Sequence, residues 1–217
     1  PEPKTPPHRI TASGSDPAAT EKALNDHHKV KNQLAAYPEP VKYEEIDTGG
    51  HVYFADYDMV QTELILLAKA DKFDASKLAK AQLFNTYFGY DMSSIVFQEI
   101  RESKSLAYVA YSAYSSASDK DNSDYSFAYI QTQSNKLPQA VDAMMELMND
   151  MPEVAPLFEA SKKSTLKKIA AQRITKSNIF WTYEALKKRG IDHDNRKEIY
   201  EEIEKMTLPD LRAFFEN

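Results

Sequence analysis

The sequence predicts an α+β fold, in which a mainly antiparallel sheet is covered by helices on one side. Strand-like segments follow one another in the first half of the chain, and helical periodicity dominates the second half. Such grouping, without regular β-α alternation, is typical of this class. With 217 residues, of which 42% are hydrophobic, the chain is long enough to bury one substantial core.

Residues 1–40 are predicted to form a proline-rich arm or linker with a possible helix. Seven of the eleven prolines lie in this stretch. Proline lacks a backbone donor, so it disfavours both helix interiors and strand ladders. Asp16 and Pro17 are residue types that begin helices, and this one would run to about Ala36. The compact domain is expected to occupy residues 41–217.

The strands are predicted from runs rich in Val, Ile, Tyr and Phe that are bounded by turn residues. Five segments have this composition: 41–46, 51–56, 59–67, 107–116 and 125–132. Gly49 and Gly50 make a turn between the first two, and a polar loop separates the last two. These short connections favour antiparallel pairing.

The helices are predicted from apolar residues that recur at helical spacing. One is expected to begin at Asp74, an N-cap residue type, and to end at Gly89. A short helix is expected over residues 92–100. The others are expected over 137–148, 156–176, 177–188, 195–205 and 208–216.

Charge and composition exclude several functional classes. The net charge of −6 argues against a dedicated nucleic-acid binder, and no apolar run approaches the roughly 18 residues of a membrane span. Residues 161–189 carry nine Lys or Arg and one acid, Glu184. This pattern indicates a solvated helix face, or else a basic surface for acidic peptides or a partner domain. The absence of cysteine excludes disulfides and thiolate chemistry and leaves the compartment open.

The chain lacks the motifs of a self-sufficient enzyme. It contains no H-x-x-E-H zinc motif, no G-x-S-x-G, no Walker loop and no dinucleotide fingerprint. Its five histidines are scattered, and the adjacent pair His27 and His28 would point about 100° apart on a helix. The sequence therefore predicts neither a metal site nor a nucleophile in this chain.

Residues 88–108, with the sequence FGYDMSSIVFQEIRESKSLAY, carry the most specific pattern. Arg101 ends the short predicted helix, where a cation suits the helix dipole, and Tyr108 opens a strand. From the residues alone both have a structural explanation, because Arg101 can cap the helix and Tyr108 is one of several strand tyrosines. Ser93 and Ser94 lie at the helix start, where hydroxyl groups commonly serve as caps.

This run resembles the pattern F-G-G-G-x-S-S-x-L-F-Q-E-I-R-E-x-x-x-L-A-Y of insulinase-like (pitrilysin) zinc metallopeptidases, in their non-catalytic C-terminal domain. The resemblance implies the fold shared with mitochondrial processing peptidase. It also implies that Arg101 and Tyr108 hydrogen-bond the substrate backbone and the transition state, since guanidinium and phenol groups are donors. Gly89, Ser93 and Ser94 would contact the substrate as well.

The implied function is that of a substrate-binding, non-catalytic domain of a zinc-dependent metalloendopeptidase. Zinc, its water and the general base would come from an upstream or partner domain with H-x-x-E-H, so this chain would hold no cofactor and be inactive alone. If the parent is a bacterial peptidase, periplasm and cytoplasm both fit. The alternative is a non-enzymatic assembly or scaffold domain of the same fold.

Two departures from the family pattern concern the turn and the last strand. Tyr90 and Asp91 occupy positions where relatives have glycine. Relatives usually have a strand after the last helix; here either that strand is absent or the chain was cut before it, and an exposed sheet edge is expected.

Overall fold

The computed structural model describes residues 16–27, 36, 39, 41, 43–47 and 49–216. They divide into one unit of residues 1–44 and 174–181 and a larger unit of residues 45–173 and 182–217. In the first unit, α1 (Pro17–His27) begins as predicted, because Asp16 Oδ1 accepts a hydrogen bond from the backbone N–H of Ala19 at 2.9 Å. The predicted continuation over residues 28–35 lies outside the described residues.

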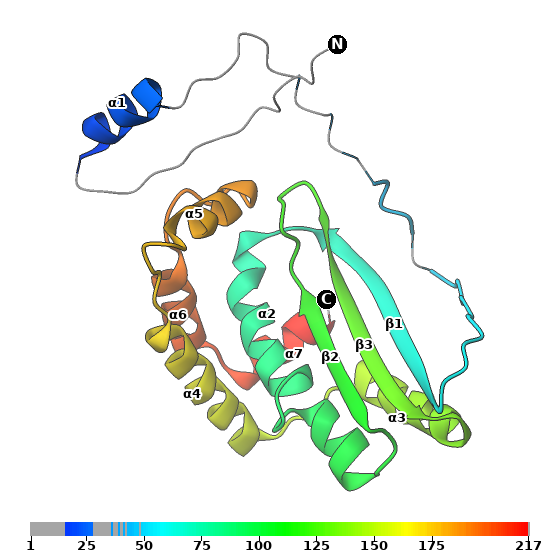
Figure 1. Ribbon diagram of the computed structural model, residues 1–217. Helices are drawn as coiled ribbons and strands as arrows, with labels where there is room; N and C mark the ends of the chain where they lie inside the picture. Colours follow the sequence, from blue (N-terminus) through cyan, green and yellow to red (C-terminus); the bar gives the residue numbers. More distant parts are fainter. Residues whose placement is uncertain are drawn as a thin grey trace, which may run out of the picture. The chain divides into compact units, whose positions relative to one another are not determined.

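In the described part of the chain, three strands form one antiparallel sheet in the order β1-β3-β2 (Figure 1). They are β1 (Gln61–Lys72), β2 (Val109–Ser115) and β3 (Ser123–Gln133). The long central strand β3 pairs with both neighbours. The α+β class and the antiparallel sheet are thereby confirmed.

The strands predicted over residues 41–46 and 51–56 are wrong for the described residues, which belong to no strand. Val52 and Phe54 are 94% and 87% exposed. The composition of these two segments suits a strand, but strand formation also requires the free edge of a neighbouring strand and a face that is buried. β1, in contrast, extends five residues beyond its predicted end at Leu67, because pairing with β3 continues to Lys72.

The helix predicted to begin at Asp74 is confirmed. Asp74 Oδ1 accepts a hydrogen bond from the backbone N–H of Ser76 at 2.8 Å. Hydrogen bonding by the Ser76 side chain, and next by its backbone N–H, lowers the pKa of Asp74 below its usual value. The helix then runs through α2 (Leu78–Phe84) and a π-helical turn (Asn85–Gly89).

Helices cover one face of the sheet (Figure 1). Alternate strand residues, among them Leu64, Ala128 and Ile130, pack against these helices in the core. The later helices lie close to their predicted positions, except that the helix predicted over 156–176 ends at Ala171. They are α3 (Leu137–Asn149), α4 (Ala155–Ala171), α5 (Ile179–Lys188), α6 (Arg196–Lys205) and α7 (Leu208–Glu216).

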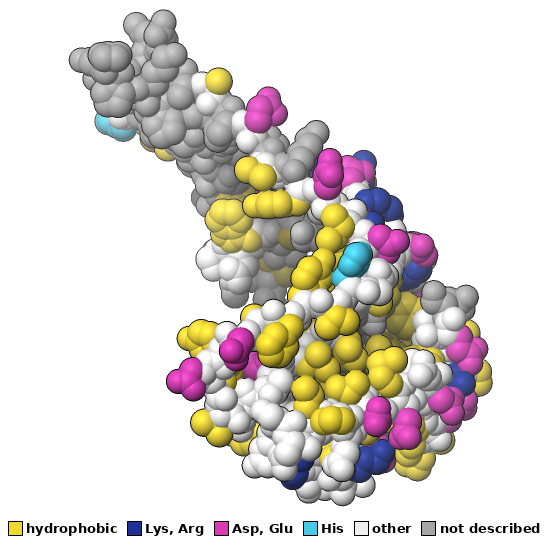
Figure 2. All heavy atoms as spheres, turned by 90° about the vertical axis from the view of Figure 1, so that its right-hand side faces the viewer, with side chains coloured by type: hydrophobic (Ala, Val, Ile, Leu, Met, Phe, Trp, Pro, Cys, Tyr) yellow, Lys and Arg dark blue, Asp and Glu magenta, His cyan; other side chains and the backbone are white. Residues whose placement is uncertain are grey.

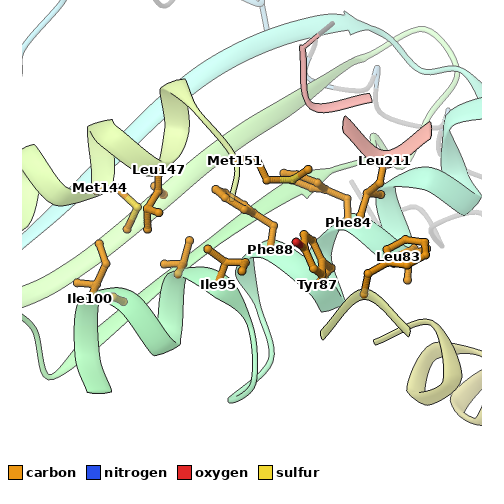
Figure 3. Packing of buried hydrophobic residues seen from close by; sticks show 14 of the residues in the cluster. Leu83, Phe84, Tyr87, Phe88, Ile95, Ile100, Met144, Leu147, Met151 and Leu211 are labelled. Atoms are coloured by element: carbon orange, nitrogen blue, oxygen red, sulfur yellow. The ribbon is translucent and has the colours of Figure 1, made fainter. Parts of the chain in front are cut away.

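The centre of the core is the end of α2 and the π-helical turn after it (Figure 3). Phe84 and Phe88 stack with ring centroids 5.0 Å apart, and Tyr87 is fully buried beside them. The Tyr87 hydroxyl donates to the carbonyl of Pro152 at 2.7 Å and accepts from the backbone N–H of Val154 at 2.9 Å. Burial of each such ring contributes about 1.5–3 kcal/mol, so this segment is firmly anchored where it leads into residues 89–108.

Candidate functional site

Gly89 brings the π-helical turn into direct contact with β2. A Cβ atom on Gly89 would lie 2.0 Å from the backbone oxygen of Ser112. Only glycine fits so close an approach to a backbone atom. Gly89 thus determines how deeply the following residues lie against the sheet, and its predicted contact with substrate stays a prediction.

Ser94 and Ser93 occupy the start of the next helix and differ in exposure. Ser94 is fully buried, and its hydroxyl accepts a hydrogen bond from the backbone N–H of Phe97 at 3.4 Å. Ser93 is exposed. Ser94 therefore caps this helix, and the predicted substrate contacts of both serines stay predictions.

The helix that carries Arg101 begins at residue 95 and continues as a π-helix over Phe97–Ser103, three residues further than predicted. The bond from Lys104 N–H to the Glu99 carbonyl, 3.2 Å, closes one of these wider turns. Arg101, which was predicted to lie at the end of the helix, therefore lies within its last turn.

Arg101 and Tyr108 come together on the surface. The Arg101 Cζ atom lies 4.8 Å from the ring centroid of Phe97 and 5.7 Å from that of Tyr108. Arg101 Nε also lies 3.6 Å from a carboxylate oxygen of Glu102. Tyr108 is 66% exposed, and its backbone N–H is bonded to the Gln131 carbonyl at 2.9 Å. The two rings hold the guanidinium by cation–π attraction and leave it accessible to a ligand.

A hollow of about 230 Å³ lies next to Arg101. Its lining comes from the turn after Gly89, from the Arg101 helix and from the start of β2: Gly89, Tyr90, Asp91, Met92, Phe97, Arg101, Val109, Ala110 and Tyr111. Asp91 is fixed by an ion pair with Lys168 of α4 at 2.7 Å. The ring of Tyr90 meets Tyr111 edge-on at 5.6 Å. The residues that replace glycine in this chain thus give the hollow an aromatic and an acidic wall.

Asn85 closes the outer edge of β2 further along the strand. Its amide nitrogen donates to the Tyr114 carbonyl at 2.9 Å, and its amide oxygen accepts from the Tyr114 N–H at 2.8 Å. An asparagine side chain so placed bonds the strand as a neighbouring strand would. Local sequence patterns do not predict this role of Asn85, because it depends on two residues that are 29 positions apart.

The arrangement can hold and polarise a carbonyl group. A guanidinium has five N–H donors and a phenol has one, and both are suited to a carbonyl oxygen that gains negative charge.

Among the residues that the structure describes, no three His, Cys, Asp or Glu side chains are grouped so that they could hold a metal ion. The side chains described therefore do not fit a zinc centre. Within the same residues, no helix has both the length and the apolar character needed to cross a bilayer.

Comparison with known structures supports the fold. A protease from Helicobacter pylori is 14% identical and matches with a TM-score of 0.68, covering 94% of this chain and 49% of that one. A peptidase M16 inactive domain from Pseudomonas fluorescens is 17% identical, with a TM-score of 0.57 over 72% of this chain and 37% of that one. A chain of Complex III2 from Candida albicans is 11% identical, with a TM-score of 0.59 over 93% of this chain and 49% of that one.

This chain thus spans at most about half the length of these three structures. No curated protein matches it. The family model described as the peptidase M16 inactive domain matches residues 12–153, more than half of the 217 residues. The resemblance found in residues 88–108 is thereby confirmed, and the chain belongs to the peptidase M16 inactive domain family.

Proposed function

We propose that this chain is the substrate-binding, non-catalytic domain of a zinc-dependent metalloendopeptidase. Its membership in a family of inactive peptidase domains supports this assignment. The observation that carries it is the meeting of Arg101 and Tyr108 on an accessible surface beside the hollow. These are the two side chains for which the sequence resemblance implies substrate contact.

In this proposal Arg101 and Tyr108 donate hydrogen bonds to the carbonyl oxygen of the scissile peptide. Phe97 holds the guanidinium from one side, so less side-chain freedom is lost when the substrate binds. As the carbonyl oxygen becomes negative in the transition state, both bonds strengthen and the barrier falls. An upstream or partner domain with H-x-x-E-H supplies the zinc-bound water and the general base.

The contribution of Gly89, Ser93 and Ser94 follows from their exposure. Ser93 is exposed and can reach a bound peptide. Gly89 and Ser94 are buried and act on the substrate by fixing the turn and the helix start that border the hollow.

The test uses the complete peptidase, with the H-x-x-E-H half present, and a fluorogenic peptide. Arg101→Ala and Tyr108→Phe should each lower kcat by about 10- to 1,000-fold, the usual effect of losing one transition-state donor. Arg173→Ala and Tyr183→Phe are matched controls, because Arg173 bonds only the nearby carbonyls of Ala170 and Gln172 in the described structure and Tyr183 is a half-exposed tyrosine of α5. Unchanged kcat in both test variants would contradict the proposal.

The isolated chain provides a second test. It should not hydrolyse peptides and should not retain zinc after dialysis. Stoichiometric zinc by metal analysis, or hydrolysis that EDTA abolishes, would show that the active centre lies in this chain.

The second candidate function is a non-enzymatic assembly or scaffold domain. The structural likeness to a chain of Complex III2 favours it. In this case Arg101 and Tyr108 serve only local packing. The double variant Arg101→Ala/Tyr108→Phe would then leave both the activity and the assembly of the complete protein unchanged.

A further inference from the structure

The sheet face that points away from the helices carries a cluster of aromatic and aliphatic side chains. We call it the aromatic face and define it by Ile65, Leu67, Tyr111, Phe127 and Tyr129. In the strand register, Ile65 lies opposite Tyr129 and Tyr129 opposite Tyr111, while Leu67 lies opposite Phe127. Since the residues that alternate with them pack into the helical core, these five point to the other side.

The aromatic face is ordered and accessible. Tyr111 stacks on Tyr129 with centroids 5.1 Å apart and meets Phe127 edge-on at 6.0 Å. Ile65 and Leu67 are nevertheless 63% and 51% exposed. Figure 2 shows hydrophobic side chains gathered on the side of the molecule where β1 lies, with charged side chains around them. A contiguous exposed apolar surface of this kind marks a binding surface more often than isolated apolar residues do.

The two central rows of the face are uncharged. The charged residues of β1 on this side, Glu63 and Lys69, lie in the rows before and after them. Burial and the neighbouring Glu63 raise the pKa of the Tyr129 phenol, so the ring stays neutral. The face therefore favours an apolar ligand group over a charged one.

The aromatic face is continuous with the hollow beside Arg101. Tyr111 belongs to both, and Tyr90, which lines the hollow, packs edge-on against it. Adjacent strands lie about 4.8 Å apart, so the path from Tyr111 across β3 to Ile65 is about 10 Å. An extended peptide covers this distance with about three residues.

We propose that the aromatic face binds a large apolar side chain of the peptide substrate, about three residues from the carbonyl held by Arg101 and Tyr108. This inference rests on the proposed function and adds a substrate class to it: peptides with Phe, Leu or a similar residue at that position. A peptide is the occupant because the face opens directly into the hollow, and a protein domain seated on it would also close the hollow.

The experiment uses the complete peptidase and compares two sets of dye-labelled peptides, one that contains Phe and one that contains Ala in its place. Phe is placed two, three or four residues from the cleaved bond on either side, and each peptide has an Ala counterpart. Binding is measured by fluorescence anisotropy with zinc removed by EDTA, and cleavage is measured with zinc present. At one position Phe should be preferred over Ala by about 10- to 200-fold, the range of apolar pocket contacts.

The variant Ile65→Thr/Tyr129→Thr should bring this preference close to one and leave the Ala peptides unchanged. Threonine suits strands, so the sheet should persist, and circular dichroism with a thermal melt checks this. Tyr183→Gln on α5 is the control for loss of an accessible tyrosine elsewhere. It should leave the preference intact.

Four results would overturn the inference. The first three are that the peptides do not bind, that Phe shows no preference over Ala at any position, and that the preference is the same in the Ile65→Thr/Tyr129→Thr variant. The fourth result is that this variant only makes the two halves of the peptidase dissociate on gel filtration. The last would make the face a domain interface. The proposed function is judged separately. Arg101→Ala should lower the cleavage of Phe and Ala peptides by the same factor. If Phe peptides bind more tightly than Ala peptides but Arg101→Ala does not change cleavage, only the proposed function is refuted.

Discussion

At the scale of single residues, Gly89 is needed because it has no side chain. Replacing a helical glycine with alanine ordinarily stabilises a protein by about 0.5–1 kcal/mol. At Gly89 the new Cβ would lie 2.0 Å from the Ser112 oxygen, a backbone atom that cannot simply rotate away. The strain of overpacking, about 1–3 kcal/mol, should therefore dominate and reverse the sign.

The prediction is that Gly89→Ala lowers the free energy of unfolding by about 1–3 kcal/mol in urea denaturation. Gly49→Ala is the matched control, because the nearest atom to its Cβ would be Asp47 Oδ1 at 3.6 Å, an ordinary contact. Equal stability of the two variants would show that the turn can move away from β2.

His193 is a second residue whose effect can be predicted, here as a dependence on pH. Its ring nitrogens lie 2.8 Å from Asp192 and 3.0 Å from Glu198, and hydrogen bonds to Asp192 first and Glu198 second raise the pKa of the imidazole above 6.5. Because the pKa of His193 is raised in the folded state, the stabilisation that its charged imidazole provides is complete below pH 6.5. This stabilisation is lost as pH rises through the pKa of the folded state.

His193→Gln should thus lower the melting temperature at pH 5 and leave it unchanged at pH 9. Proton NMR titration of the imidazole checks the direction of the pKa shift. His51→Gln, in an exposed segment outside the helices and strands, is the matched control and should leave the melting temperature unchanged. A larger loss at pH 9 than at pH 5 would contradict the assignment.

At the scale of elements, the π-helical turn and β2 are joined by Asn85. Asn85→Ala would leave the N–H and the carbonyl of Tyr114 without their partners. The expected loss is about 1–3 kcal/mol, with faster hydrogen exchange of the Tyr114 amide. Asn149→Ala, at the exposed end of α3, should stay within about 0.5 kcal/mol. Unchanged exchange at Tyr114 would mean that this edge is protected by other contacts.

At the scale of the whole molecule, the arm and the compact unit are expected to be energetically separable. The described helix of the arm, α1, has no buried residue. Glu45, at the boundary, accepts bonds from the N–H and hydroxyl of Ser123 at 2.6 and 2.8 Å and pairs with Lys72 at 2.7 Å. These bonds lower the pKa of Glu45 to about 2, and the bond with Lys72 contributes most.

Deletion of residues 1–40 should therefore leave the melting temperature unchanged, whereas deletion of residues 1–47 should lower it. The difference in melting temperature between the two truncations should have its full size above pH 4.5 and should disappear as pH falls through about 2. The reason is that the pKa of Glu45 is lowered in the folded state. A lower melting temperature after the shorter deletion would show that the arm supports the compact unit. The predicted domain boundary at residue 41 would then be wrong.

The sequence by itself determined the α+β class, nearly all helix positions, and the spacing of Arg101 and Tyr108 that identified the family. It could do so because helical periodicity and capping act between residues at most a few positions apart, as at Asp16 and Asp74. Only the tertiary structure decided which apolar segments pair as strands, why residue 89 must be glycine, and that Tyr111 and Ile65 share one face with the Arg101 hollow. These features depend on contacts between residues that are distant along the chain, and local composition does not encode which distant edge or carbonyl a segment will meet.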